Sequence, residues 1–240
     1  MEARALLDIL DLTLLDKGAS EGELEELCIK ANEYRPAAVC VFKKHIRFVK
    51  SRLNDEIPIS ALVGGFPIGS ESPQEIANEI LDAINSGAQE IDCVLEPSDE
   101  DVFPSQREMS KLIAMREASS GYLLKVIVEA PILDERKLRG VIRMALASGA
   151  DFVKSCTGRR GGCSEEAADI MAFEVRRHCQ TMGGSAGLKI SGGVSSKADA
   201  ERLISRVLDQ DPSISGSARI RLGSSSLMGE LLESGGLGRN

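Results

Sequence analysis

Aromatic residues are scarce in this 240-residue sequence: tryptophan is absent, and aromatic side chains account for 3% of the chain. Such a composition disfavours a platform on which nucleic-acid bases could stack. The formal net charge of −8 also argues against the clustered basic surface that a phosphate backbone requires. We therefore expect no nucleic-acid partner and only a local anion site. A small polar molecule is the ligand class that this composition favours.

Long apolar runs are missing as well. No stretch approaches the ~20 consecutive apolar residues that cross a bilayer. The N-terminal segment MEARALLDIL carries acids where a secretory signal peptide would carry bases. We therefore expect a cytoplasmic protein with no membrane partner.

Histidine and paired cysteine are also in short supply. The two histidines, His45 and His178, each fall in a basic, helix-like segment, so we expect both to be solvated rather than catalytic. The six cysteines are irregularly spaced and form no C-x-x-C motif, which argues against a zinc site or a redox pair. We expect reduced thiols, and neither a metal nor another cofactor.

What the sequence does contain is a repeated alternation of short β-type runs and amphipathic helical segments. Its length and 42% hydrophobic content support a full core, in one large barrel or in two small domains. The runs that we assign as strands are 9–13, 38–42, 59–63, 90–94, 124–128, 151–155, 187–191 and 219–223. Strands that alternate with helices are predicted to be parallel.

Local signals mark the helix ends. Ser-x-x-acid boxes predict helix starts at Ser20/Glu23, Ser72/Glu75, Ser105/Glu108 and Ser196/Asp199. Gly87 and Gly149 are predicted to end helices, in the related copies SGAQEIDCV and SGADFVKSC. One βα unit is therefore used repeatedly along the chain.

The number of these units predicts the fold class. Eight units of about thirty residues each fit an α/β protein of the (β/α)₈ (TIM) barrel type, which is typically ~250 residues long. No linker divides the chain, so we predict one barrel domain over residues 1–240, with a flexible tail at 234–240. A doubly wound open sheet is the alternative, but no G-x-G-x-x-G fingerprint follows the first strand.

Chemistry in such a barrel gathers at the C-terminal ends of the strands. Lys154 ends one apolar run before a Gly-rich, basic loop, and Lys189 repeats this arrangement in LKISGGV. A lone lysine at a strand end usually only extends its amine to water. Two amines on neighbouring strands, each before a loop suited to phosphate, suggest instead a Schiff-base enzyme for a phosphorylated aldehyde.

Further charged residues accompany the two lysines. Buried charges cost several kcal/mol each unless they are paired, so Asp92, Lys125, Lys154 and Lys189 must form one network or face water. A purely structural ion network is the alternative interpretation. The last three loops favour an anion site, because their glycines allow close backbone approach and Thr157, Ser225 and Ser226 add hydroxyl donors.

Taken in order, these strand ends resemble deoxyribose-phosphate aldolase, a class I aldolase family with a (β/α)₈ fold. The resemblance is carried by LDLTLLD (10–16), AAVCVF (37–42), GGFPIG (64–69), EIDCVL (90–95), LKVIVEA (124–130), DFVKSCTGR (151–159), LKISGGV (188–194) and RLGSSSL (221–227). It implies reversible cleavage of 2-deoxy-D-ribose 5-phosphate into D-glyceraldehyde 3-phosphate and acetaldehyde, in deoxyribonucleotide catabolism.

The resemblance also implies a role for each matched residue. Lys154 would form the Schiff base, Lys189 would lower its pKa by like-charge repulsion, and Asp92 would be the acid/base carboxylate. Substrate binding is implied for Asp11, Cys40, Lys125, Thr157, Gly158, Arg159, Gly192, Gly193, Gly223, Ser225 and Ser226. No metal or other cofactor is implied, the partner is a small sugar phosphate, and a homodimer or homotetramer is left open.

Two departures from the family pattern bear on the site. Lys43 stands where a proline is usual after the second strand, and its positive charge is expected to bear on substrate preference. No tyrosine follows Tyr122, although some members use one at the C-terminus in proton transfer. One alternative function is another Schiff-base barrel aldolase for a related sugar phosphate, such as a transaldolase-like enzyme. Another is a non-catalytic relative that binds sugar phosphates, against which the joint presence of Lys154, Lys189 and Asp92 argues.

Overall fold

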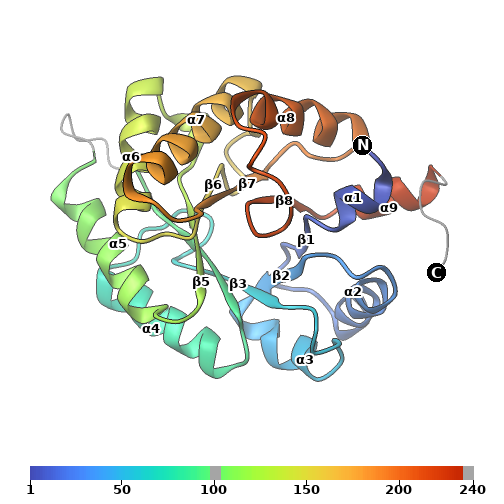
Figure 1. Ribbon diagram of the computed structural model, residues 1–240. Helices are drawn as coiled ribbons and strands as arrows, with labels where there is room; N and C mark the ends of the chain where they lie inside the picture. The colour runs from blue at the N-terminus through green and yellow to red at the C-terminus, as the bar shows by residue number, and fades with distance from the viewer. Residues whose placement is uncertain (98–103, 235–240) are drawn as a thin grey trace.

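In residues 1–97 and 104–234, which the computed structural model describes, eight parallel strands close into a barrel in chain order (Figure 1). They are β1 (Leu10–Leu14), β2 (Ala38–Phe42), β3 (Ile59–Val63), β4 (Glu90–Val94), β5 (Leu123–Ile127), β6 (Phe152–Lys154), β7 (Gly187–Ser191) and β8 (Ile220–Ser224). β8 pairs with β1 and closes the barrel. The predicted (β/α)₈ barrel is therefore confirmed, and the open-sheet alternative is wrong. Each predicted strand agrees with the observed one to within a residue at either end.

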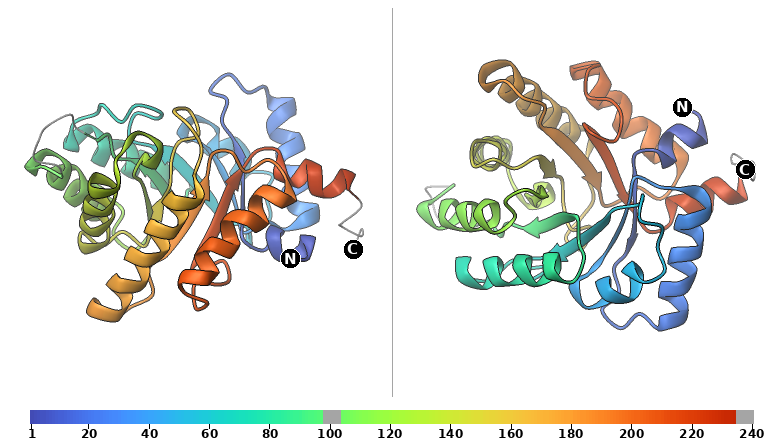
Figure 2. Two further views of the ribbon diagram at one scale, coloured as in Figure 1. Left: turned by 90° about the horizontal axis from the view of Figure 1, so that it is seen from above. Right: turned by 60° about the horizontal axis from the view of Figure 1, so that its bottom comes forward.

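Helices surround the barrel and alternate with its strands (Figures 1 and 2). They are α1 (Ala3–Leu7), α2 (Glu21–Tyr34), α3 (Ile46–Lys50), α4 (Pro73–Asn85), α5 (Gln106–Ala118), α6 (Glu135–Ala147), α7 (Glu165–Met182), α8 (Lys197–Gln210) and α9 (Leu227–Glu233). Two 3₁₀ turns, η1 (Lys43–His45) and η2 (Ala130–Ile132), follow β2 and β5. The extra helix α1 precedes β1, and both α1 and α9 contact α8.

The local signals read from the sequence set the helix boundaries. All four predicted capping boxes form, at the starts of α2, α4, α5 and α8. Gly87 and Gly149 follow α4 and α6 with φ of 113° and 90°. Beyond each glycine, the next backbone N–H bonds back into the helix, from Ala88 to Ala83 and from Ala150 to Ala145, both at 3.1 Å. The positive φ of the glycine and this hydrogen bond back to the helix together end each helix and direct the chain into the next strand.

The apolar core lies between the barrel and its helices. Outward-facing strand residues such as Val39 and Ile91 pack with helix residues such as Ile76 and Ile80, and all four are at most 1% exposed. Burial of each such side chain contributes roughly 1.5–3 kcal/mol. A smaller apolar cluster (Cys40, Phe42, Leu62, Phe66, Val94, Ile127) lies apart from this layer. The helix-facing layer thus supplies the stability, which leaves inward positions on the strands available for charged groups.

The fold corrects one expectation about the histidines. His45 is not solvated: it is 6% exposed, and its Nε2 lies 3.1 Å from the carbonyl oxygen of Asp16. The turn η1 directs this ring inward while the neighbouring Lys44 remains exposed, so the basic segment gave a misleading signal.

Two other expectations concern membranes and the C-terminal tail. No helix in the described part of the chain combines the length and the apolar character needed to cross a bilayer. The predicted flexible tail at 234–240 lies outside the described residues, apart from Ser234.

Candidate active site

The parallel register places the two predicted lysines side by side. Lys154 ends β6, and its partner in the register is Lys189 on β7. Alternate side chains of a strand point to the same face, so paired positions on neighbouring strands project together into the barrel. Lys154 is 4% exposed and Lys189 is fully buried. The two amines therefore differ in their access to solvent.

Asp92 on β4 joins the two amines. Its Oδ2 lies 2.8 Å from Lys154 Nζ and 2.7 Å from Lys189 Nζ. Its Oδ1 accepts a hydrogen bond from Ser60 at 2.7 Å and lies 3.0 Å from Lys125 Nζ. Burial raises the pKa of Asp92, but the three lysines outweigh burial and hold that pKa well below its usual range. Asp92 is therefore a carboxylate at neutral pH.

A further set of ion pairs extends this network. Lys125 Nζ lies 3.0 Å from Asp11 Oδ2 and 2.5 Å from Glu90 Oε2. The Arg221 guanidinium reaches the same two acids, at 2.6 Å from Asp11 Oδ1 and 3.0 Å from Glu90 Oε1. Lys189 Nζ also donates to Asp11. The expectation that the buried charges form one network is thus confirmed.

The buried acids keep two of the lysines protonated. Burial lowers the pKa of Lys125, but Asp11, Asp92 and Glu90 raise it well above its usual value. Lys189 behaves in the same way, because Asp11 and Asp92 outweigh the effect of burial and raise its pKa. Both side chains are therefore ammonium ions at neutral pH.

A cavity of about 450 Å³ opens at the C-terminal ends of β1, β6, β7 and β8. Nine of the residues nominated from the sequence line it: Lys154, Thr157, Gly158, Arg159, Gly192, Gly193, Gly223, Ser225 and Ser226. Residues of the β1 loop, Thr13 to Asp16, complete one wall. One lysine, four glycines, three hydroxyl groups and an arginine from this set thus surround a volume suited to a small anionic molecule.

The remaining nominated residues do not line this cavity. Asp11, Cys40, Asp92, Lys125 and Lys189 are all 0% exposed. Substrate binding by Asp11, Cys40 and Lys125 stays a prediction, and their polar groups are directed into the buried network. Cys40 Sγ, for instance, lies 3.9 Å from Asp92 Oδ2.

Glycine is required where the β6 and β7 loops meet. Gly158 and Gly192 have φ of 74° and 77°, a region that other residues rarely adopt. A Cβ on Gly192 would lie 2.6 Å from Cys156 Sγ and 3.1 Å from Gly158 Cα. Gly223 has a different function, because a Cβ there would lie 3.0 Å from Lys189 Cε. Its missing side chain makes room for the lysine, a role that the sequence did not suggest.

Several functional residues were missed at the sequence level. Glu90 and Arg221 complete the buried network, and strand alternation could have identified them, since they precede Asp92 and Gly223 by two residues. Glu129 is fully buried with a left-handed φ of 52°, and it accepts hydrogen bonds from the Thr157 N–H and hydroxyl. The Thr157 hydroxyl is therefore already engaged in holding its loop.

Arg160 extends the Glu129 contact to a third loop. Its Nε lies 2.9 Å from Glu129, and its two terminal nitrogens bind Glu96 at 2.9 and 2.6 Å. The loops after β4, β5 and β6 are therefore tied together beside the cavity. No sequence pattern pairs these residues, because the contacts depend on barrel closure.

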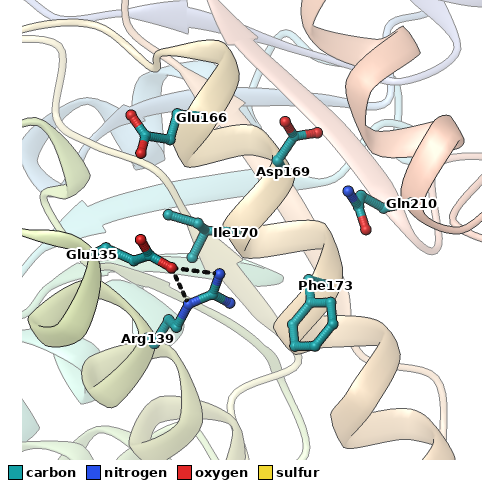
Figure 3. A pocket seen from close by; sticks show the side chains of 7 residues that line it. All are labelled: Glu135, Arg139, Glu166, Asp169, Ile170, Phe173 and Gln210. Carbon is teal, nitrogen blue, oxygen red and sulfur yellow. Dashed lines mark hydrogen bonds and ion pairs between the residues drawn. The ribbon is translucent and has the colours of Figure 1, made fainter.

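A second hollow, of about 220 Å³, lies outside the barrel between α6, α7 and the end of α8 (Figure 3). Its lining consists of Glu135, Arg139, Glu166, Asp169, Ile170, Phe173 and Gln210. The guanidinium of Arg139 is already paired with Glu135 at 2.8 Å and Glu174 at 3.0 Å. Because these residues come from helix faces rather than strand ends, we do not assign the chemistry to this hollow.

The described residues offer little support for a metal site or for a reactive cysteine. Within 1–97 and 104–234, no group of three or more His, Cys, Asp or Glu side chains is arranged to hold a metal ion. The six cysteines are free thiols. Burial raises the pKa of Cys40 and of Cys156, so both are protonated at neutral pH.

The fold and the site together define a class. Amines and a carboxylate meet at the strand ends of a closed barrel, beneath a cavity that suits a small anion, and this is the arrangement of a barrel aldolase. Comparison with known proteins makes the assignment specific. The model of the DeoC/LacD family of aldolases matches residues 8–227, and the chain belongs to that family.

Individual relatives agree with the family assignment. A deoxyribose-phosphate aldolase from Exiguobacterium sibiricum is 33% identical over 205 residues, covering 83% of this chain and 88% of the relative. One from Streptococcus pneumoniae is 35% identical over 191 residues, covering 80% and 84%. The solved structure of the tetrameric deoxyribose phosphate aldolase from Aeropyrum pernix superposes with a TM-score of 0.77 at 25% identity, covering 97% of this chain and 91% of that one.

Proposed function

We propose that this aldolase reversibly cleaves 2-deoxy-D-ribose 5-phosphate into D-glyceraldehyde 3-phosphate and acetaldehyde, through a Schiff base on Lys154. The relatives from Exiguobacterium and Streptococcus, both named deoxyribose-phosphate aldolase, support the substrate. The observation that carries the proposal is the position of Lys154, which lines the cavity while its amine shares one oxygen of Asp92 with Lys189.

The contacts of the two lysines support different roles. Lys189 binds two carboxylates, Asp11 and Asp92, and it is fully buried. Lys154 has a single carboxylate contact, with Asp92, and faces the cavity. An amine with an ordinary pKa of ~10.4 must lose a proton before it can attack a carbonyl. A permanent ammonium at Lys189 favours that loss by like-charge repulsion.

The reaction then proceeds in balanced steps. The neutral Lys154 amine attacks the C1 aldehyde, and the resulting carbinolamine loses water to form an iminium. As the C2–C3 bond breaks, its electron pair moves toward the iminium nitrogen and gives an enamine, while the C3 hydroxyl loses its proton and becomes the aldehyde of glyceraldehyde 3-phosphate. Protonation of the enamine at C2, followed by hydrolysis, releases acetaldehyde and restores Lys154.

Asp92 is the group that we assign to proton transfer. Its Oδ2 is within hydrogen-bond distance of Lys154 Nζ, where the amine and the carbinolamine exchange protons. Reaching the C3 hydroxyl requires a bridging water, because Asp92 is fully buried. Asp11, Lys125 and Cys40 support Asp92 rather than bind substrate, since none of them lines the cavity.

The cavity loops provide the 5-phosphate site in this proposal. Gly192 and Gly193 line the cavity and carry no side chains, so an anion can approach their backbone N–H groups closely. Ser225 and Ser226 line the same cavity from the β8 loop, and Arg159 adds a positive charge from the β6 loop. Arg159 itself donates to the carbonyl of Leu15 at 2.8 Å, so it also holds the β1 loop against this wall.

Lys43, the unusual residue after β2, stands apart from this cavity. It pairs with Asp82 at 3.3 Å and lines a separate hollow with Phe42 and Phe66. We therefore expect the substitution for proline to leave the preference for deoxyribose 5-phosphate unchanged.

A substrate panel tests the proposed function. The purified protein is incubated with 2-deoxyribose 5-phosphate, ribose 5-phosphate, fructose 6-phosphate and unphosphorylated deoxyribose, and the released acetaldehyde or other aldehyde is measured. We expect the highest kcat/KM with deoxyribose 5-phosphate. A higher kcat/KM for a longer sugar phosphate would assign the chain to another Schiff-base aldolase, and binding without cleavage would identify a non-catalytic relative.

Assembly and location are also part of the proposal. We infer a homo-oligomer, a dimer or a tetramer, because the Aeropyrum relative is described as tetrameric. We also infer a cytoplasmic location, since the free thiols and a phosphorylated substrate suit a reducing compartment.

A further inference from the structure

The buried charges beneath the cavity balance without Lys154. Three carboxylates, Asp11, Glu90 and Asp92, meet three cations, Lys125, Lys189 and Arg221. Each of these cations contacts at least two of the acids. A protonated Lys154 would therefore add an uncompensated positive charge to a site from which water is largely excluded, and such a charge is costly.

Glu90 and Arg221 complete the balance of buried charges, and both lie outside the cavity. Glu90 is 5% exposed and Arg221 is 6% exposed. One guanidinium nitrogen of Arg221 binds Asp11 and the other binds Glu90, while Glu90 also binds Lys125. Arg221 is further fixed by a hydrogen bond from its Nε to the carbonyl of Ser217. Neither residue lines the cavity, so neither contacts a substrate there.

We propose that Glu90 and Arg221 are positioning residues of the reaction, which hold Asp11 and Lys125 and balance the buried charges so that Lys154 is the amine left without a proton. The inference rests on the proposed function, in which Lys154 is the nucleophile. It assigns the activation of Lys154 to the whole ion network, with Lys189 as one member.

Other ionisable groups around Lys154 leave this balance intact. The titratable and charged groups on the surrounding strands and loops include Asp11, Asp16, Cys40, Glu90, Asp92, Glu96, Lys125, Glu129, Cys156, Arg159, Arg160, Lys189 and Arg221. Cys40 and Cys156 are neutral thiols, because burial raises their pKa. Glu129 is paired with Arg160, a guanidinium that it shares with Glu96. Asp16 and Arg159, unlike Lys154, are exposed, so solvent screens their charges.

The proposal predicts opposite effects for the two partners. Arg221→Gln leaves three carboxylates with two cations, so Lys154 keeps its proton to higher pH. Glu90→Gln leaves three cations with two carboxylates, so the proton is lost at lower pH. The double variant Glu90→Gln/Arg221→Gln is balanced again, and its behaviour should return toward that of the unmodified protein.

The test measures imine formation at Lys154 as a function of pH. Each protein is treated with acetaldehyde and cyanoborohydride for a fixed short time, and N-ethylation of Lys154 is quantified by peptide mass spectrometry. We expect the midpoint of the profile to rise by on the order of one pH unit in Arg221→Gln and to fall in Glu90→Gln. Arg221→Lys, which retains the charge, should have a midpoint near the unmodified value.

Arg219→Gln is the matched control. Arg219 lies just before β8 and donates to the carbonyl of Ala186 at 2.8 Å, away from the buried acids. The pH midpoint of imine formation in Arg219→Gln should therefore equal that of the unmodified protein. If the midpoint of folded Arg221→Gln equals that of this control, the proposal is wrong. If Arg221→Gln does not fold, the Glu90→Gln variant provides the test. An unchanged pH midpoint of imine formation in Glu90→Gln would contradict the proposal. Absence of any adduct on Lys154 in the unmodified protein would instead contradict the proposed function.

Discussion

At the scale of single residues, two lysines occupy paired positions on adjacent strands yet differ in their contacts. Lys189 lies between two carboxylates at 0% exposure, whereas Lys154 has one carboxylate contact and 4% exposure at the cavity wall. Identical side chains can therefore have different roles. The sequence predicted this pair, because each lysine precedes a recognisable loop. It did not predict Glu90 or Arg221. Arg221 lies more than 100 residues from both Glu90 and Asp11 in the sequence, and these side chains meet only when the barrel closes.

Lys189→Leu tests this difference at the residue scale. Removing the ammonium leaves Asp11 and Asp92 with fewer cations, so Lys154 should keep its proton and its imine should form only at more alkaline pH. We expect trapping with borohydride to be strongly reduced at pH 7 and partly restored near pH 10, after circular dichroism has shown that the variant is folded. Lys197→Leu, at the start of α8 and outside the buried network, serves as a control and should trap as the unmodified protein does. Equal loss of trapping at both pH values would contradict the assignment of Lys189 as the residue that favours proton loss from Lys154.

At the scale of elements, the loops after β5, β6 and β7 act as one unit. Gly158 and Gly192 bring two of these loops into direct backbone contact, and Glu129 fixes Thr157 from the end of β5. Strand ends and helix caps could be predicted because they depend on neighbours within about four residues. The contacts of Arg160 with Glu129 and Glu96 could not be predicted from the sequence, because the three residues belong to three different loops.

A charge placed in the β8 loop tests the phosphate site. Ser225→Asp puts a carboxylate at the cavity wall, where it should repel the 5-phosphate but not a neutral sugar. We expect KM for deoxyribose 5-phosphate to rise at least tenfold, a change of about 1.4 kcal/mol, while KM for unphosphorylated deoxyribose changes little. Ser120→Asp, on an exposed turn before β5, is the control and should leave both values unchanged. Equal effects of Ser225→Asp on the two substrates would show that this loop does not bind phosphate.

At the scale of the whole molecule, the barrel isolates ionised groups that an unfolded chain would expose. The pKa of Asp92 is held well below its usual range, and burial raises the pKa of Cys163 from 9.0 to about 12. A depressed carboxyl pKa contributes stability that is present above ~pH 4 and lost as the pH falls. A raised thiol pKa contributes stability that is present below pH 9.0 and lost as the pH rises toward 12. Stability should therefore be greatest between these limits.

Urea unfolding at pH 3, 7 and 10.5 measures this dependence. We expect the free energy of unfolding to be highest at pH 7 and lower at both extremes. Between pH 9 and pH 10.5, Cys163 should contribute a decline of about 1.4 kcal/mol per pH unit, which Cys163→Ala should remove. An identical alkaline decline in Cys163→Ala and in the unmodified protein would show that this thiol is not buried in its protonated form.

The central claim is that Lys154 is the amine that forms the Schiff base. The most direct measurement is reduction of the unmodified protein with borohydride in the presence of acetaldehyde, followed by mass spectrometry of its peptides. The account predicts one stoichiometric ethyl adduct on Lys154. An adduct on Lys189 or Lys125 in place of Lys154 would contradict the account, even if the protein cleaved deoxyribose 5-phosphate.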